Sequence, residues 1–339
     1  MYVPRREQFS GCLIGQCLGD ALGFPVEGYP PEVCQRYVAE TLASEQVGGR
    51  GRDPFPFGQY TDDSQLAREL LQSYVACRGF EPGDYARRIA AIFAEDRVVG
   101  RGRATEAAAR RLAAGVPWQA AGTPAPSAGN GSAMRVGPIG LLFFDDPERL
   151  VRAAHDQGRI THQDRRCSAG AVAIAGAVAL ALGSEAVEPQ AFLAQLSEWV
   201  QAVEPSVASY IRQLAEWIAL PPGEAVVYIA PAGKTPGYAD GWQGISPFVI
   251  GSVLWSLYAF LRTPDDYWAT VCTAIAVGGD VDTTAAMAGA VSGASLGLEA
   301  IPAHLAGQVT DQGTWGFDEL VALAHEAYQL KMERGRGHV

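Results

Sequence analysis

Two short acidic clusters, about 220 residues apart in the chain, carry the side chains best suited to chemistry. The first is Thr61-Asp62-Asp63-Ser64, and the second is Asp280-Val281-Asp282-Thr283-Thr284. Each cluster places two carboxylates beside a threonine hydroxyl at the start of a predicted helix. Hard divalent cations such as Mg²⁺ and Mn²⁺ bind oxygen ligands of this kind, whereas Zn²⁺ favours nitrogen and sulfur. The two clusters are therefore candidate halves of a metal site.

Helix capping is the simpler explanation for either cluster taken alone. Asp, Thr and Ser are favoured N-cap residues because their side-chain oxygens accept hydrogen bonds from free backbone N–H groups. A cap requires only one such residue, yet each cluster holds two acids and a threonine. Crowded carboxylates cost free energy unless a cation or a hydrogen-bond donor neutralises them. The pair indicates a metal site only if the fold brings both helix starts together.

Three further stretches offer candidate binding groups, and each has a plainer alternative. Pro25 ends the first predicted helix and presents Glu27 on a loop, where a lone acid is normally a solvated surface charge. Gly129-Asn130-Gly131-Ser132 runs into a predicted helix start at 133–135, so its backbone N–H groups could hold an anion. The same Gly/Pro-rich stretch also fits a linker. His162, taken alone, is better explained as a helix cap or a packed polar residue.

Composition limits the classes of function. The chain has 339 residues, of which 48% are hydrophobic, enough for a real core and too many for general disorder. Its formal charge of -11 argues against general binding to nucleic acid or to anionic membrane surfaces. The six cysteines form no C-x-x-C pair, and no signal peptide is evident, so we expect free thiols in a reducing cytoplasm.

Helical periodicity dominates the chain, and the pattern predicts an all-α, compact orthogonal bundle with the site at clustered helix ends. We expect one domain over 1–339, with 184–240 as a variable, insert-like segment. The only plausible strand is 226–230, and the Gly/Pro-rich segment around it holds potential ligand-facing side chains: Tyr228, Lys234, Tyr238 and Trp242. Helices are predicted at 7–23, 31–44, 61–77, 82–94, 104–114, 147–157, 167–182, 188–202, 205–219, 246–262, 264–277, 282–297 and 316–333.

Glycine recurs every four residues in the first helix, at Gly11, Gly15, Gly19 and Gly23. Because residues four apart lie on one helical face, this line predicts close approach of another helix.

Beyond these local patterns, the chain resembles the ADP-ribosylglycohydrolase family, which includes the dinitrogenase reductase-activating glycohydrolases. The matching stretches are GCLIGQCLGDALGFPVEG, YTDDSQLA, GRATEAAARRLAAG, GNGSAMRVGPIGLLF, ITHQDRRCSAGAVAIAGAVALAL and the long segment from GISPF to SGASLG. They occur in the family's order between about residues 11 and 300. The TDD and GGDVDTTAA elements together are highly specific, whereas 184–240 matches poorly and is expected to bear on which target is accepted.

The resemblance implies a binuclear centre of two Mg²⁺ or Mn²⁺ ions. Its ligands would be Thr61, Asp62, Asp63, Asp280, Asp282 and Thr283. It further implies that Glu27 lies at the metal centre, that GNGSAMR (Gly129, Asn130, Gly131, Ser132 and Met134 among its residues) holds the diphosphate of ADP-ribose, and that His162 lies near the ligand. Val281 replaces a polar residue that many relatives carry, and we expect little consequence because its side chain can point away from the metals.

The activity implied is metal-dependent hydrolysis of the glycosidic bond between ADP-ribose and an acceptor, with protein arginine as the first expectation. The candidate catalytic carboxylates are Glu27, Asp62 and Asp282, since negative charge stabilises an oxocarbenium-like transition state. Other acceptors left open are serine, polymer or O-acetyl linkages and small-molecule conjugates. Two alternatives come from other classes: a two-metal phosphoesterase, which would yield AMP, and a non-catalytic ADP-ribose-binding protein.

Overall fold

The computed structural model describes residues 3–43, 51–183 and 186–336. Within these ranges the regular structure is helical, and strand-like pairing is limited to isolated bridges. The predicted all-α class is confirmed. Most helices begin and end no more than three residues from their predicted bounds.

The helices of the first half are α1 (Arg6–Gly23), α2 (Pro31–Arg36), α3 (Asp62–Cys77), α4 (Pro82–Ala94), α5 (Arg103–Ala113), α6 (Trp118–Ala121), α7 (Gly137–Phe143) and α8 (Pro147–Arg159). Those of the second half are α9 (Arg165–Leu182), α10 (Pro189–Gln201), α11 (Pro205–Trp217), α12 (Pro222–Ile229), α13 (Val249–Arg262), α14 (Tyr267–Ala276), α15 (Val281–Leu296), α16 (Ala303–Ala306) and α17 (Phe317–Arg336). Short turns η1 (Phe24–Val26), η2 (Tyr37–Leu42) and η3 (Leu298–Ala300) follow α1, α2 and α15.

Proline and acidic caps explain many of these helix starts. Proline occupies the first position of α4, α8, α10, α11 and α12, where its missing N–H leaves no hydrogen bond unmade. The side chains of Asp146, Asp164 and Asp266 accept backbone N–H groups from the first turns of α8, α9 and α14. Asp164, and not His162, is therefore the residue that caps α9.

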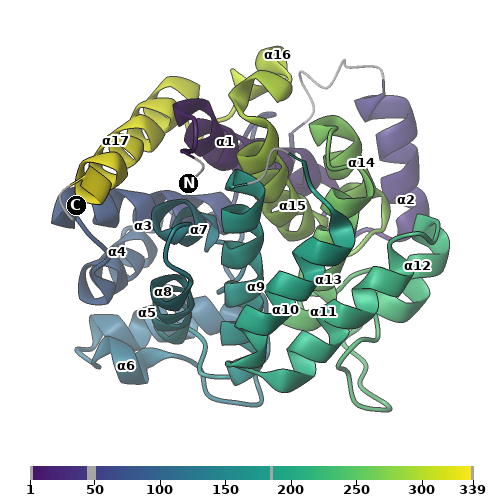
Figure 1. The fold of residues 1–339 in the computed structure, drawn as a ribbon, viewed down its shortest axis with the longest axis horizontal. Coiled ribbons are helices and arrows are strands. Elements are labelled where there is room, and N and C mark those ends of the chain that lie inside the picture. Colours follow the sequence, from purple (N-terminus) through teal and green to yellow (C-terminus); the bar gives the residue numbers. More distant parts are fainter. Residues whose placement is uncertain (1–2, 44–50, 184–185, 337–339) are drawn as a thin grey trace.

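The fold is organised around the pairing of α1 with α15, two helices from opposite ends of the chain that lie side by side in Figure 1. The face of α1 that touches α15 is the predicted line of glycines: Gly11, Gly15, Gly19 and Gly23. A β-carbon at Gly19 would overlap the carbonyl oxygen of Ala285 and lie 2.7 Å from its carbonyl carbon. Gly289 of α15 faces Gly15 in the same way. The two backbones are therefore in direct contact.

Other helices pack against both members of this pair. Helices α3 and α17 pack against α1, while α9, α13 and α14 pack against α15. The segment 184–240 supplies α10, α11 and α12, which lie over α9 and α13 (Figure 1). Of the described helices, α9 alone is long and apolar enough to cross a membrane, but 83% of it is buried inside the protein, as in a core helix. The six cysteines are free, as predicted.

Three local predictions were wrong. The expected strand at 226–230 belongs to helix α12: Ala225 and Ile229 are buried, four residues apart, while Val227 and Tyr228 are exposed, which is a helical period. The expected helix start at 133–135 is a series of turns, because Pro138 has no N–H to donate and α7 begins only at Gly137. The helix expected over 31–44 is regular only to Arg36 and continues as the π-helical turn η2.

Candidate active site

The C-terminal end of α1 and the N-terminal ends of α3 and α15 meet at one point of the fold. One carboxylate oxygen from each of Asp20, Asp63 and Asp282 lies within 4.8 Å of the other two. Glu27, Asp280 and Asp282 form a second group with the same spacing. Asp282 belongs to both groups, so the two acidic clusters of the sequence form one continuous site. The condition set for a shared metal site, that the remote helix starts meet, is fulfilled.

Asp20 is a site residue that sequence reasoning missed. It lies in the last turn of α1, fully buried, and its carboxylate accepts the backbone N–H of Thr61 at 2.9 Å and of Ser64 at 3.1 Å. The hydroxyl of Ser64 also donates to it at 2.7 Å. Asp20 therefore fixes the start of α3 on the end of α1. The available signal was an acid among the glycines and apolar residues of the second half of the helix.

The second cluster is held by groups from other loops. The backbone N–H of Asp280 donates to Ile245 O at 2.8 Å, and the side-chain amide of Asn130 donates to Asp280 Oδ2 at 2.6 Å. The hydroxyl of Thr283 donates to the other Asp280 oxygen at 3.3 Å. Asn130 therefore joins the glycine loop directly to Asp280, the acidic residue that precedes α15.

Glu27 lies at the rim of the site, and it is not a free surface charge. Arg52 Nη1 pairs with Glu27 Oε2 at 2.6 Å, and the Glu27 side chain is 27% exposed. The loop that carries Glu27 is tied to α15 by two backbone hydrogen bonds, from Gly28 N to Gly279 O and from Gly279 N to Tyr29 O. Gly279 has a φ of +90°, a conformation that favours glycine. The position of the Glu27 loop is thus fixed relative to the second cluster by backbone hydrogen bonds.

Burial and mutual repulsion raise the pKa values of the five clustered aspartates, Asp20, Asp62, Asp63, Asp280 and Asp282. Loss of solvation is the largest cause for all of them, and the charge of Asp63 is the next for Asp20, Asp62 and Asp280. The pKa of Asp63 rises to about 6 and that of Asp280 to about 8. The pKa values of Asp20, Asp62 and Asp282 lie well above their usual range. Protons occupy part of this cluster near neutral pH unless cations replace them.

The donor set fits a hard divalent cation. Asp63 Oδ1 is buried and has no hydrogen-bond partner among the described residues, which is costly for a carboxylate. The groups around it are carboxylates and threonine hydroxyls, all of them oxygen donors. Such a set suits Mg²⁺ or Mn²⁺ better than Zn²⁺.

A cavity of about 500 Å³ opens over the acidic site. Its walls include the predicted residues Glu27, Asp62, Asp63, Gly129, Asn130, Gly131, Met134, His162, Asp280, Asp282 and Thr283. Thr61 and Ser132 are buried just behind this lining. The segment 100–105, which leads into the first turn of α5 and which sequence reasoning did not assign to the site, forms another wall, and the Gly102 N–H lies 3.5 Å from Asp62 Oδ2. Arg101 and Arg103 of this segment also line the cavity.

The glycine loop differs in part from its prediction. The N–H of Asn130 donates to Pro247 O at 3.0 Å and is not free for an anion. The N–H groups of Gly129, Gly131 and Ser132 have no protein acceptor in the described part of the chain. The loop therefore offers three free N–H groups, interrupted at Asn130, in place of the predicted consecutive run.

Of the four aromatic and basic residues noted in 221–245, only Trp242 reaches this cavity. Tyr228 stacks on Trp217, with ring centroids 5.8 Å apart, and Lys234 pairs with Asp240 at 3.0 Å. Tyr238 packs against Phe248. These three side chains thus contact other residues of the protein and do not line the acidic cavity.

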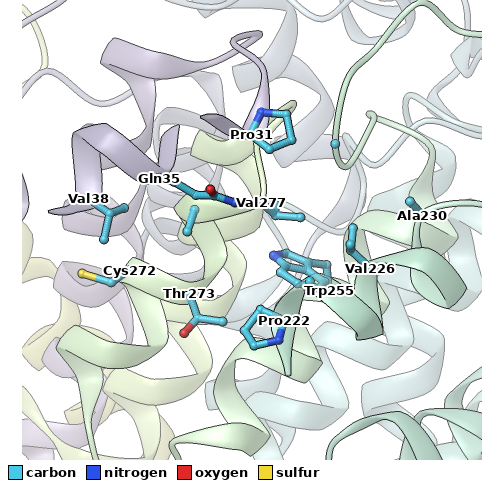
Figure 2. A pocket seen from close by; sticks show the side chains of 13 residues that line it. Pro31, Gln35, Val38, Pro222, Val226, Ala230, Trp255, Cys272, Thr273 and Val277 are labelled. Atoms are coloured by element: carbon cyan, nitrogen blue, oxygen red, sulfur yellow. The ribbon is translucent and has the colours of Figure 1, made fainter. Parts of the chain in front are cut away.

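A second cavity, of about 460 Å³, lies between α2, α12, α13 and α14. Figure 2 shows Val38, Trp255 and Cys272 around it. None of its lining residues is Asp, Glu, His, Lys or Arg, and its one thiol, Cys272, has no second metal-ligating or acid–base side chain beside it in the lining. The acidic cavity is the candidate active site.

Comparison with known proteins decides the family. The family model described as ADP-ribosylglycohydrolase matches residues 1–337. The chain belongs to the ADP-ribosylglycohydrolase family. It is 28% identical to the ADP-ribosylhydrolase ARH3 of Gallus gallus, over 96% of this chain and 94% of that protein. It is 24% identical to the ADP-ribosyl-[dinitrogen reductase] glycohydrolase of Rhodospirillum rubrum, over 86% of each. A solved structure, an ADP-ribosylglycohydrolase-related protein complex, matches 97% of this chain and 99% of that one, with a TM-score of 0.71 and 29% identity.

Membership makes this glycohydrolase an enzyme that cleaves glycosidic bonds of ADP-ribose. The predicted family and the predicted helical fold are both confirmed. In this glycohydrolase, the acidic residues that the resemblance named lie together at one cavity and form clusters that could bind metal.

Proposed function

We propose that this glycohydrolase is a metal-dependent enzyme that releases ADP-ribose from modified arginine. The observation that carries the proposal is the meeting of two remote acidic helix starts beside a glycine loop at one cavity. A purely structural role leaves the buried, unpaired Asp63 Oδ1 without an explanation.

Two divalent cations, Mg²⁺ or Mn²⁺, would be held by Thr61, Asp62, Asp63, Asp280, Asp282 and Thr283, with Asp20 beside them. The two overlapping carboxylate groups that share Asp282 support a pair of ions. When bound, such ions polarise oxygen ligands and activate water.

The protein's own groups position and stabilise the substrate. The free N–H groups of Gly131 and Ser132 would donate to the diphosphate and so align the reactive sugar. Asp62 and Asp282 would stabilise positive charge that develops on the ribose as the glycosidic bond breaks. Glu27 would exchange a proton with the leaving group or with water, since it is the carboxyl of the site that solvent reaches most easily.

Glu27 supports a cationic acceptor such as arginine. Of the five acidic side chains that line the cavity, it is the one that the proposed metal ligands leave unassigned. Glu27 at the rim would face a guanidinium with an opposite charge. The helices α10, α11 and α12 of the segment 184–240 would contribute to the choice of target. We place this activity in the cytoplasm.

The test is incubation with ADP-ribosyl-arginine peptide and Mg²⁺ or Mn²⁺, with and without chelator, followed by chromatography of the products. We expect ADP-ribose to be released with metal and not with chelator. Serine-linked and small-molecule conjugates, run in parallel, would reveal a different acceptor. AMP as the product would indicate a phosphoesterase, and no release from any conjugate under either metal would refute the proposal.

A further inference from the structure

A buried arginine stands behind the glycine loop. Arg135 is completely buried, and its guanidinium donates from Nε to Gln157 Oε1 at 3.0 Å and from Nη2 to Gln157 O at 3.0 Å. Nη2 also donates to Thr161 Oγ1 at 2.8 Å. Gln157 in turn donates to Ser132 O at 2.8 Å, so the arginine is tied to the loop. The mechanism proposed above assigns no task to this buried cation.

Thr161 links Arg135 to His162 through hydrogen bonds. Thr161 Oγ1 lies 2.8 Å from His162 Nδ1, and Thr161 is fully buried. A guanidinium can only donate, so the threonine oxygen is an acceptor toward Arg135. Among the described residues, His162 Nδ1 is then the only acceptor within reach of the threonine hydroxyl proton. Full satisfaction of this buried hydroxyl requires Nδ1 to be unprotonated.

The other ring nitrogen of His162 faces the glycine loop. A β-carbon at Gly131 would lie 3.3 Å from His162 Nε2, and one at Gly129 would lie 3.6 Å from it. His162 is 2% exposed and lines the acidic cavity, and its Nε2 has no protein hydrogen-bond partner in the described part of the chain. An unpaired nitrogen at this place points to a ligand.

We propose that Arg135 and Thr161 are positioning residues that hold His162 as a neutral imidazole with its proton on Nε2. His162 then presents one fixed hydrogen-bond donor to an oxygen of the ligand that lies over Gly129 and Gly131. The identity of that ligand as ADP-ribose rests on the proposed function, whereas the tautomer of His162 does not.

The electrostatic surroundings of His162 agree with a neutral ring. Loss of solvation is the main cause that lowers its pKa, to about 3, and the charge of Arg135 lowers it further. Asp164 is the acid that opposes this effect, and its own pKa is lowered mainly by hydrogen bonds from Arg166. Asp164 is thus engaged by another cation, and the ring keeps one proton.

The tautomer can be measured without substrate. Long-range ¹H–¹⁵N NMR spectra of the full chain distinguish Nε2–H, Nδ1–H and imidazolium forms, and the chain has five histidines, so His162→Gln assigns the signal. We expect Nε2–H between pH 5 and 8. In Thr161→Val we expect a mixture of tautomers, while Thr161→Ser, which keeps the hydroxyl, should match the wild type. An Nδ1–H or imidazolium signal in the wild type, or an unchanged tautomer in Thr161→Val, would overturn the proposal.

Binding of ADP-ribose, measured by calorimetry, tests whether Thr161 acts through His162. Thr161→Val should weaken binding about three- to tenfold, the contribution of one net hydrogen bond. In a His162→Ala background the same substitution should change binding less than about twofold. Equal weakening in both backgrounds would overturn the positioning role. If the wild type does not bind ADP-ribose at all, the proposed function fails, and the NMR result still decides the tautomer.

Discussion

Substituting Gly19 by alanine tests whether the spacing of α1 and α15 controls the acidic site. Gly19 precedes Asp20 in the chain and touches Ala285 of α15, one turn beyond Asp282. In an isolated helix, alanine is more favourable than glycine by about 1 kcal/mol. If the helices were not in contact, Gly19→Ala would therefore stabilise the protein. Because the helices are in contact, we expect Gly19→Ala to destabilise the protein instead.

The size of the effect follows from the packing. The new β-carbon would lie 2.7 Å from the Ala285 carbonyl carbon, whereas carbon atoms in ordinary contact are roughly 3.5 Å apart. The helices must separate by about 0.8 Å, or the strain must be absorbed elsewhere. Overpacking of this kind costs about 1–3 kcal/mol, so we expect a net loss of up to about 2 kcal/mol after the gain of about 1 kcal/mol in helix propensity. Ligand distances around a metal tolerate only about 0.2 Å, so Mn²⁺ affinity should fall about tenfold or more.

Urea unfolding in chelator gives the stability, and calorimetric titration with Mn²⁺ gives the affinity. Gly223→Ala is the matched control, because Gly223 also lies in a helix, α12, and no atom approaches its β-carbon position within 4 Å. That variant should be unchanged or slightly more stable, with wild-type Mn²⁺ affinity. A stabilised Gly19→Ala would refute the helix contact. A destabilised Gly19→Ala with unchanged Mn²⁺ affinity would refute the link between helix spacing and the acidic site.

The remaining predictions concern the acidic site, His162 and a buried ion pair. Asp62→Ala and Asp282→Ala should each abolish release of ADP-ribose while circular dichroism stays helical; activity in either variant contradicts its assignment to the metal site. Because the pKa of His162 is lowered to about 3, the unfolded chain takes up a proton that the folded protein excludes as the pH falls below about 6.5. This proton uptake costs up to about 1.4 kcal/mol of stability per pH unit. In urea titrations between pH 6 and 4.5, His162→Gln should therefore lose less stability than the wild type. Equal slopes of the free energy of unfolding against pH in the two proteins would disprove the lowered pKa of His162. Asp311→Ala removes the 2.6 Å partner of the fully buried Arg68 and should cost about 3 kcal/mol in urea unfolding; a loss under about 1 kcal/mol would show that Glu69 alone compensates.

Sequence reasoning succeeded where one local pattern has one physical cause. A glycine every four residues allows only a close helix contact on that face, and Gly11 to Gly23 make it. Two acids and a threonine at a helix start exceed what capping needs, and Asp63 and Asp282 indeed meet. Neither local pattern predicts that the two acidic clusters lie together, because their proximity depends on how α1 and α15 pack. Family resemblance supplied that step.

The residues that were missed act through distant partners. Asp20 looks like an isolated acid until its bonds to Thr61 and Ser64, more than 40 positions away, are seen. The strand expected at 226–230 was inferred from β-branched residues, but burial of Ala225 and Ile229 against α13 decided for a helix. Tertiary contacts outweighed local preference in both cases.

The pairing of α1 with α15 also bears on how the protein is made. The two helices are about 260 residues apart, and ribosomes add about 5–20 residues per second. The glycine face of α1 therefore spends on the order of 10–50 seconds outside the ribosome before its partner is synthesised. A nascent chain cannot assemble the acidic site until translation has passed Thr284. A polypeptide truncated before that point therefore lacks half of the site and is expected to be inactive.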